Sequence, residues 1–259
     1  FVLGISQSDW NALLNDERKP LLNKATSGAY PPGSTFKMVV AAAALELGLI
    51  GLNDKIFCAG FYELGSRKFH CWLKGGHGKL TLQEAIQKSC DVYFYELARK
   101  VGVKSIGAMA RRLGLGQAYN LPLTGLSKGF VPTKKWKKER FGTSWLVGDT
   151  LNVGIGQGFS LATPLQLAVM TARLASGKEV TPNIIKNSNK NPDNPKALSI
   201  KENTLVAIRK GMFDVLNEKE GTAFNYRSTD ENFSIAGKTG TSQVRKITRE
   251  EREKGVIKN

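Results

Sequence analysis

The sequence predicts a mixed α/β (α+β) fold in which helices outnumber strands. The first observation is a run of alanine and other apolar residues over about 34–47, which favours a buried helix. The second is a series of helical patterns farther along the chain. The third is an alternating segment with β-branched residues over about 233–244, which favours a strand. Together they predict a largely helical insert between one central helix and a sheet.

The amino-terminal part is predicted to be a loop with a short helix over 1–30, leading into the helix at 34–47. Pro31-Pro32-Gly33 cannot continue a helix backwards, so Ser34 falls in its first turn, and Gly48 supplies a stop. Residues 51–79 are rich in glycine and aromatic residues and show little periodicity. We therefore expect an irregular excursion there.

The remaining helices are predicted from apolar periodicity and from start signals. Thr163-Pro164 is a favourable helix start, whereas 114–143 is rich in Gly, Pro and Lys. Asn187 to Pro195 predicts an exposed turn. The helical patterns cover about 80–101, 103–113, 163–176 and 200–217.

The composition fits a globular protein with ample core for one large domain or two closely joined subdomains. The chain has 259 residues, and 38 Lys and Arg against 22 Asp and Glu give a net charge of +16. Such an excess suggests nucleic acid or an anionic surface as partner. No nucleic-acid motif accompanies it, so we expect no nucleic-acid partner. For the basic run 134–140 we favour a solvated loop, with a membrane-facing surface as the alternative.

The two ends of the sequence suggest a piece of a longer protein. No stretch has the apolar length of a membrane span, and no signal peptide opens the chain. The chain starts abruptly at Phe1-Val2-Leu3-Gly4 and closes on a polar segment. We therefore expect a domain truncated at both ends.

Ser34 and Lys37 form a Ser-x-x-Lys pair at the start of the predicted helix. Residues three apart share a helix face, so hydroxyl and amine point to the same spot. A desolvated lysine loses proton affinity and can act as the base that activates a serine. The helix N-terminus also favours negative charge developing beside it. Since this spacing is common by chance, a capping serine with a surface lysine is the alternative.

Two later segments complement this pair. Ser89-Cys90-Asp91 lies within a helical pattern, and 234–242 contains Lys238-Thr239-Gly240-Thr241 on the predicted strand. Small residues on that strand would let a peptide pair with its backbone. Its lysine and the two threonine hydroxyls would meet a carboxylate.

The three segments, in this order, resemble the signature of penicillin-binding proteins and serine β-lactamases. Other stretches narrow the resemblance, over nearly the whole chain, to class B penicillin-binding proteins of the elongation type, penicillin-binding protein 2. One departure is Asp91, where many relatives have Asn; an ionised Asp accepts hydrogen bonds but donates none. The resembling stretches are 6–10, 13–16, 25–26, 30–37, 76–78, 89–95, 154–158, 162–166 and 236–241.

This resemblance implies the penicillin-binding protein/serine β-lactamase transpeptidase fold. In that fold an antiparallel sheet flanked by helices packs against an all-helical subdomain, with the active site in the groove between them. The resemblance implies one transpeptidase domain over 1–259. Its approximate subdomains are a mostly helical part, 57–221, and a sheet-containing part formed by 1–56 with 222–259.

The resemblance also implies a serine-type peptidoglycan D,D-transpeptidase that cross-links stem peptides during cell-wall elongation. Ser34 attacks the carbonyl between the last two D-alanines, with Lys37 as general base. Backbone N–H groups of Ser34 and Thr241 stabilise the oxyanion. Ser89 and Lys238 relay a proton to the departing amine, and the chemistry requires no cofactor. The implied catalytic residues are Ser34, Lys37, Ser89, Asp91 and Lys238, and the implied substrate-binding residues are Thr239, Gly240 and Thr241.

Three other functions remain open from the sequence. Ser34-Thr35-Phe36-Lys37 also resembles class D β-lactamases, although their Tyr-Gly-Asn segment is missing. A sensor domain of β-lactam receptors would be acylated without turnover. A structural role in recruiting other cell-wall proteins is the third.

A metal site is a further hypothesis. Cys58, Cys71 and Cys90 are the only cysteines, and His77 lies among them. The spacing is not that of a zinc finger, and buried thiols or one disulfide with a leftover thiol are the alternatives. Three thiolates and an imidazole would close a tetrahedral structural zinc site that braces the second segment. Some penicillin-binding protein 2 members are similar in carrying zinc ligands here; His70 is the competing ligand.

The resemblance finally implies partners and a location. The partners are peptidoglycan stem peptides, β-lactam antibiotics and a membrane glycosyltransferase of the elongation machinery. The location is the periplasmic face of the bacterial inner membrane, where a transmembrane helix preceding this chain would anchor the protein.

Overall fold

The computed structural model describes residues 2–185, 195–230 and 232–241. The α-helices there are α1 (Gln7–Asn15), α2 (Lys37–Glu46), α3 (Leu82–Gln87), α4 (Asp91–Arg112), α5 (Lys134–Phe141), α6 (Val147–Gly154), α7 (Pro164–Ser176) and α8 (Glu202–Asn217). The strands are β1 (Ile56–Cys58), β2 (Phe61–Leu64), β3 (Arg67–His70) and β4 (Gly78–Leu80), and two 3₁₀ turns cover Gly33–Phe36 and Phe224–Tyr226.

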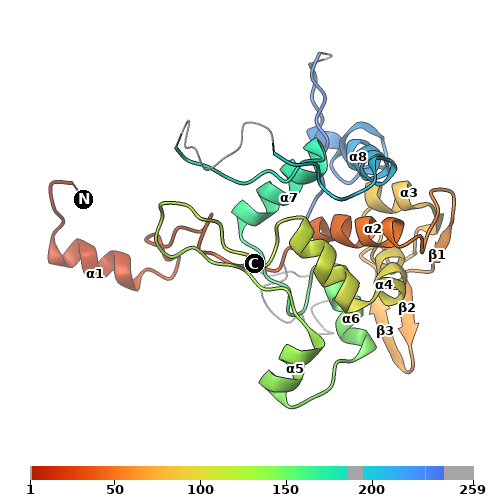
Figure 1. The fold of residues 1–259 in the computed structure, drawn as a ribbon, viewed down its shortest axis with the longest axis horizontal. Coiled ribbons are helices and arrows are strands. Elements are labelled where there is room, and N and C mark those ends of the chain that lie inside the picture. Colours follow the sequence, from red (N-terminus) through yellow and green to blue (C-terminus); the bar gives the residue numbers. More distant parts are fainter. Residues whose placement is uncertain (1, 186–194, 231, 242–259) are drawn as a thin grey trace.

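Helix α2 is the centre of the hydrophobic core. Every residue from Lys37 to Ala44 is buried. Helices α3, α4 and α8 pack around α2 (Figure 1). Because a helix enclosed by others needs apolar residues on all its faces, its sequence is alanine-rich rather than amphipathic. The predicted helix over 34–47 is confirmed, with a 3₁₀ turn as its first part.

The other predicted helices are also confirmed, with one extra break. Gly102, at φ 76°, kinks α4 at the boundary predicted between 101 and 103. A second break, at Ser89, separates α3 from α4 and was not predicted. Helix α7 begins as expected, because the Thr163 hydroxyl accepts from the Gln166 N–H while the Gln166 side chain accepts from the Thr163 N–H.

The excursion predicted over 51–79 is partly regular. Strands β2 and β3 form a hairpin in which Phe61 is opposite His70, and β1 pairs with β4 so that Cys58 is opposite Gly78. Both pairs are antiparallel. Each strand has only three or four residues, too few to show alternation in the sequence. The two strand pairs hold Cys58 and Cys71 near α4.

The basic run 134–140 is a helix, so the predicted solvated loop is wrong. The Thr133 hydroxyl caps α5 at its start, and Gly142 ends it in the left-handed conformation. Lys137 is buried and donates to Asp149 at 2.5 Å. These contacts fix α5 against α6, a helix that the sequence analysis did not identify.

The strand predicted at 233–244 is also absent over its described part. Residues 232–241 lie beside no other strand within the described chain, and hydrogen bonds to α8 hold them instead. A strand forms only with a neighbouring strand, which sequence alternation alone does not supply. Residues 242–244, and 187–194 of the predicted turn, lie outside the described residues.

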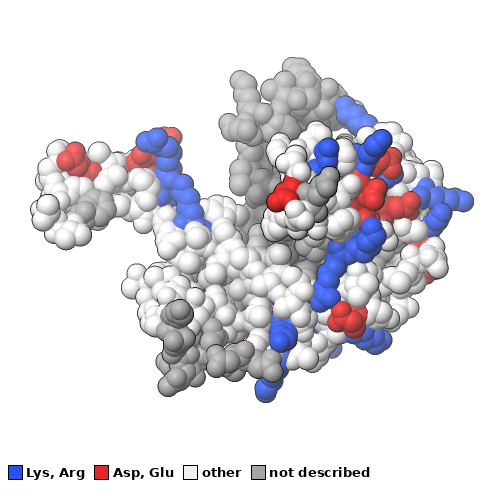
Figure 2. Space-filling model, turned by 90° about the horizontal axis from the view of Figure 1, so that it is seen from above, with Lys and Arg blue, Asp and Glu red and all other residues white. Residues whose placement is uncertain are grey.

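The molecular surface carries charges of both signs. Acidic side chains lie among the lysines and arginines on the face drawn in Figure 2. Helix α1 buries none of its residues and lies apart from the other helices (Figure 1). Among the described residues no helix is both long and apolar enough to cross a membrane. The subdomain boundaries at 57 and 221 stay a prediction.

Candidate active site

The first predicted segment forms a tight turn that leads into α2. Ser34 is half-buried in the 3₁₀ turn, and its carbonyl accepts from the backbone N–H of Lys37. The Thr35 hydroxyl donates to the Pro32 carbonyl at 2.7 Å. The Gly33 N–H donates to the Gly156 carbonyl at 2.9 Å, and a Cβ at either glycine would overlap nearby backbone. The segment around Gly156 therefore fixes the position of Ser34.

The ammonium group of Lys37 links the first segment to the second. It is fully buried and donates to the Ser89 carbonyl at 2.8 Å, the Ser89 hydroxyl at 3.2 Å and an Asp91 carboxylate oxygen at 2.8 Å. The ring of Phe94 lies 5.6 Å from the nitrogen. A buried charge is tolerated only when its donors are satisfied, and here three acceptors satisfy them.

Ser89 has a left-handed backbone, with φ 53°, at the end of α3. Its N–H donates to the Ile86 carbonyl, and the N–H of Cys90 donates to the Ala85 carbonyl. These two bonds define a Schellman motif, in which Ser89 occupies the position that usually holds glycine. A left-handed serine costs about 1–3 kcal/mol relative to an ordinary backbone. In this conformation the Ser89 carbonyl and hydroxyl both accept hydrogen bonds from Lys37.

Asp91 accepts two bonds and donates none. One carboxylate oxygen binds Lys37, and the other accepts from the backbone N–H of Trp72 at 3.0 Å. The Trp72 indole N–H lies 3.1 Å from the carbonyls of Lys88 and Ser89. Both carboxylate oxygens thus act as acceptors, whereas the NH₂ group of an Asn could not accept either bond.

The third segment packs against the first and is anchored on α8. The Gly237 N–H donates to the Met212 carbonyl at 3.0 Å. Gly240 lies so close to Thr35 that a Cβ would come within 2.9 Å of the threonine methyl. The carbonyl of Thr241 accepts from the Gln157 side chain at 3.1 Å. These contacts place Lys238-Thr239-Gly240-Thr241 beside the turn that contains Ser34.

Lys238 is half-buried on the side facing Lys37 and Asp91. Its ammonium donates to the carbonyl and to the hydroxyl of Thr239, at 3.1 and 3.2 Å. Burial, and then the positive charge of Lys37, lower the pKa of Lys238 to about 7. A group with this pKa exchanges protons readily at neutral pH. The arrangement as a whole suits acyl transfer through a serine nucleophile.

The four predicted metal ligands also come together. The ligand atoms of Cys58, Cys71, His77 and Cys90 all lie within 4.8 Å of one another. All three cysteines are buried and free, so no disulfide forms among them. A hydrogen bond from Cys90 lowers the pKa of Cys71 to about 5 and raises the pKa of the Cys90 thiol. His70, the competing candidate, is exposed on β3.

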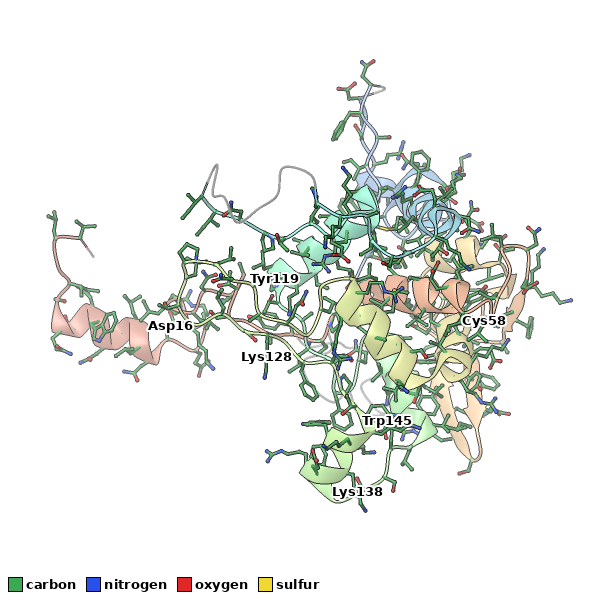
Figure 3. All side chains as sticks on the ribbon, in the orientation of Figure 1. Asp16, Cys58, Tyr119, Lys128, Lys138 and Trp145 are labelled. Carbon is green, nitrogen blue, oxygen red and sulfur yellow. The ribbon has the colours of Figure 1, made fainter. Side chains whose placement is uncertain are left out.

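The cluster lies next to the second segment and away from α5. Figure 3 shows Cys58 among the strands beside α4, while Lys138 and Trp145 lie near α5 and α6. Cys90 is both a member of the cluster and the N-cap of α4, where its sulfur accepts from the Tyr93 N–H. The cluster thus adjoins Ser89 and Asp91 directly.

Sequence reasoning missed three residues that position the site: Trp72, Gln157 and Thr222. Trp72 follows a predicted ligand, and Gln157 lies in 154–158, one of the stretches that carry the family resemblance. Thr222 had no signal, because its contacts come from residues distant in sequence.

Known proteins resemble this chain over nearly its whole length. The family model of the penicillin-binding protein transpeptidase domain matches residues 3–256. The peptidoglycan D,D-transpeptidase MrdA of Haemophilus influenzae is 38% identical over 94% of this chain and 39% of its own length. For MrdA of Escherichia coli K12 the identity is 36%, over 94% and 40%. The chain therefore spans about two fifths of these relatives, and it belongs to the penicillin-binding protein transpeptidase family.

Solved structures show the same fold. A penicillin-binding protein (PBP2) from Helicobacter pylori superposes with a TM-score of 0.87 and 41% identity, over 93% of this chain and 46% of that one. Pseudomonas aeruginosa PBP2 in complex with WCK 5153 has a TM-score of 0.85 and 36% identity, over 93% and 54%. The H. pylori protein is also solved in complex with MreC. The predicted transpeptidase fold of mixed helix and sheet is confirmed.

The strained backbone of Ser89 gives a first test. Ser89→Gly and Ser89→Ala both lose the hydroxyl that bonds Lys37, but only glycine adopts φ 53° without strain. We expect the glycine variant to be more stable than the alanine variant by about 1 kcal/mol or more, measured as the free energy of unfolding in urea. Equal stability of the two variants would contradict the strain.

Proposed function

We propose that this chain is the catalytic domain of a peptidoglycan D,D-transpeptidase that cross-links stem peptides during cell-wall elongation. The observation that supports this best is the buried Lys37 ammonium, three residues after Ser34 and bound to both Ser89 and Asp91. Because Lys37 is fully enclosed, it is not the exposed surface lysine of the alternative interpretation. The MrdA relatives are transpeptidases by name, which supports the same reaction.

In the proposed acylation, Ser34 attacks the carbonyl carbon between the last two D-alanines of a stem peptide. For this step the Lys37 ammonium passes one proton to its partner Asp91, 2.8 Å away, and the resulting amine accepts the Ser34 proton as the new C–O bond forms. Backbone N–H groups of Ser34 and Thr241 face the developing oxyanion; each such donor contributes about 3–4 kcal/mol. The C–N bond then breaks, and the terminal D-alanine leaves with a proton passed through Ser89 from Lys37.

The second half-reaction reverses these steps with another amine. An amine from a neighbouring stem peptide attacks the ester carbon and gives up a proton to Lys37. The amide bond forms as the C–O bond to Ser34 breaks, and Ser34 regains its proton from Lys37. The Lys238 ammonium and the hydroxyls of Thr239 and Thr241 hold the terminal carboxylate of the donor, with Gly240 leaving room for the peptide backbone. Lys238, with its pKa of about 7, can also return a proton.

Incubation with penicillin tests whether Ser34 is the nucleophile. We expect intact-mass measurement after incubation to show one penicillin added per chain, because a β-lactam presents the same carbonyl and carboxylate to Ser34 and Lys238. Ser34→Ala should show no added mass, whereas Ser27→Ala, a nearby serine outside the site, should be acylated like the wild type.

Two outcomes of this experiment would contradict the proposal. A wild-type protein that penicillin leaves unmodified would contradict the assignment of Ser34 as nucleophile and the proposed acyl transfer with it. Rapid hydrolysis of the drug, with the free enzyme recovered within seconds, would instead identify a β-lactamase.

We further propose that the Cys58, Cys71, His77 and Cys90 cluster binds a structural zinc ion. His77 Nδ1 lies 3.6 Å from the Cys58 sulfur and 3.5 Å from the Cys71 sulfur. In a tetrahedral site with Zn–S of about 2.3 Å and Zn–N of about 2.0–2.1 Å, the distance between a sulfur ligand and a nitrogen ligand is about 3.5–3.6 Å. With four protein ligands the ion has no open position and would brace the loop that contains Trp72.

Metal analysis tests whether this cluster binds zinc. We expect about one zinc per chain by metal analysis, and Cys58→Ser should lower both the zinc content and the melting temperature, because a structural zinc contributes folding free energy. His70→Gln, which changes the exposed histidine next to Cys71, should keep both. A zinc-free protein that melts at the same temperature with and without a chelator would contradict the proposal.

Partners and location follow from the relatives as proposals. A structure titled as a peptidoglycan synthase complex that coordinates polymerisation and cross-linking matches 83% of this chain at 31% identity, with a TM-score of 0.73. We propose a membrane glycosyltransferase as the working partner of this domain. The domain would then act at the periplasmic face of the inner membrane.

A further inference from the structure

Thr222 lies between the second and third segments of the site and contacts both. Its backbone N–H donates to the carbonyl of Gln87, at the end of α3, at 3.3 Å. Its hydroxyl oxygen lies 2.8 Å from the hydroxyl oxygen of Thr239. Gln87 is two residues before Ser89 in the chain. Thr222 thus connects the strained turn of Ser89 to the segment that contains Lys238.

The backbone around Thr222 is held in place by the end of α8. The Gly221 N–H donates to the Glu218 carbonyl at 2.8 Å, and the Ala223 N–H donates to the Val215 carbonyl at 3.0 Å. A Cβ at Gly221 would overlap the carbonyl oxygens of Asp214 and Val215. Because both neighbours of Thr222 are fixed in this way, its hydroxyl has a defined position.

The hydrogen bonds of the Thr239 hydroxyl can be counted. A hydroxyl has one proton to donate and two lone pairs that accept. The Lys238 ammonium, which only donates, uses one lone pair at 3.2 Å. If Thr222 donates to the other lone pair, both acceptor sites of Thr239 are filled. Its proton is then left to point away from Lys238 and Thr222, toward an incoming acceptor.

We propose that Thr222 is a positioning residue that turns the Thr239 proton toward the terminal carboxylate of the stem peptide. The proposal rests on the transpeptidase function above and adds a residue that acts through Thr239 without touching the reacting atoms. Without the Thr222 hydroxyl, nothing donates to the second lone pair of Thr239, so its O–H group can rotate to other orientations and fewer molecules present the proton to the carboxylate. The loss should affect ligands that carry a carboxylate and spare those that do not.

The test compares benzylpenicillin with its methyl ester on the full chain. We expect Thr222→Val, which removes the hydroxyl and keeps the shape, to lower the acylation rate constant for benzylpenicillin by about 3- to 10-fold, the effect of one ordinary hydrogen bond. The rate constant for the ester should change by less than about 2-fold. Thr222→Ser should restore the wild-type preference for the acid.

Controls separate this role from a structural one. Thr171→Val, which removes a hydroxyl bonded to a backbone carbonyl on α7, should leave both rate constants unchanged. Thr222→Ala is measured beside Thr222→Val so that the result does not depend on one variant folding. Equal losses for acid and ester, or no rescue by serine, would overturn the role of Thr222 alone. A wild-type protein that benzylpenicillin does not acylate would overturn the proposed function as well.

Discussion

The buried ammonium group of Lys37 is the interaction on which the rest of the site depends. It joins α2, the central helix of the core, to the junction between α3 and α4 through Ser89 and Asp91. A buried charge that loses its partners costs several kcal/mol, so the α3–α4 junction cannot move away from α2 without a large penalty. The same contact compensates for the left-handed backbone of Ser89. The hydrogen bonds between Lys37 and Ser89 therefore offset both the strain of the Ser89 backbone and the cost of burying the Lys37 charge.

Residues that do not touch Lys37 also hold the junction between α3 and α4 in place. Cys90 caps α4 and belongs to the Cys and His cluster, and Trp72 donates from the loop of that cluster to Asp91. On the opposite side, Thr222 connects the end of α3 to Thr239. The turn that contains Ser34 is fixed separately, by the close approach of Gly33 to Gly156. The site is thus assembled from rigid elements, as pre-organised catalysis requires.

The sequence predicted what depends on local pattern and on composition. The apolar run after Pro31-Pro32-Gly33 located α2. Residue types together with the family resemblance indicated the four metal-ligand candidates, and the fold brings them together. The short strands over 56–80 were too short to show a period, and α5 was hidden by its charge although Thr133 and Gly142 cap it. The break at Ser89 occurs at a serine where glycine would be expected. The predicted strand at 233–244 failed over its described part because pairing depends on a neighbour, not on alternation.

A double-mutant cycle on Lys37 and Asp91 tests the central interaction most directly. Lys37→Met and Asp91→Leu would be made singly and together, and the free energy of unfolding would be measured for all four proteins. Each single variant leaves one member of the pair, the buried Lys37 or the partly buried Asp91, without its charged partner, so we predict a loss of about 3 kcal/mol or more for each. The double variant should lose less than the sum, by about 2 kcal/mol or more. Losses that simply add would show that the two side chains do not depend on each other, and would contradict the account.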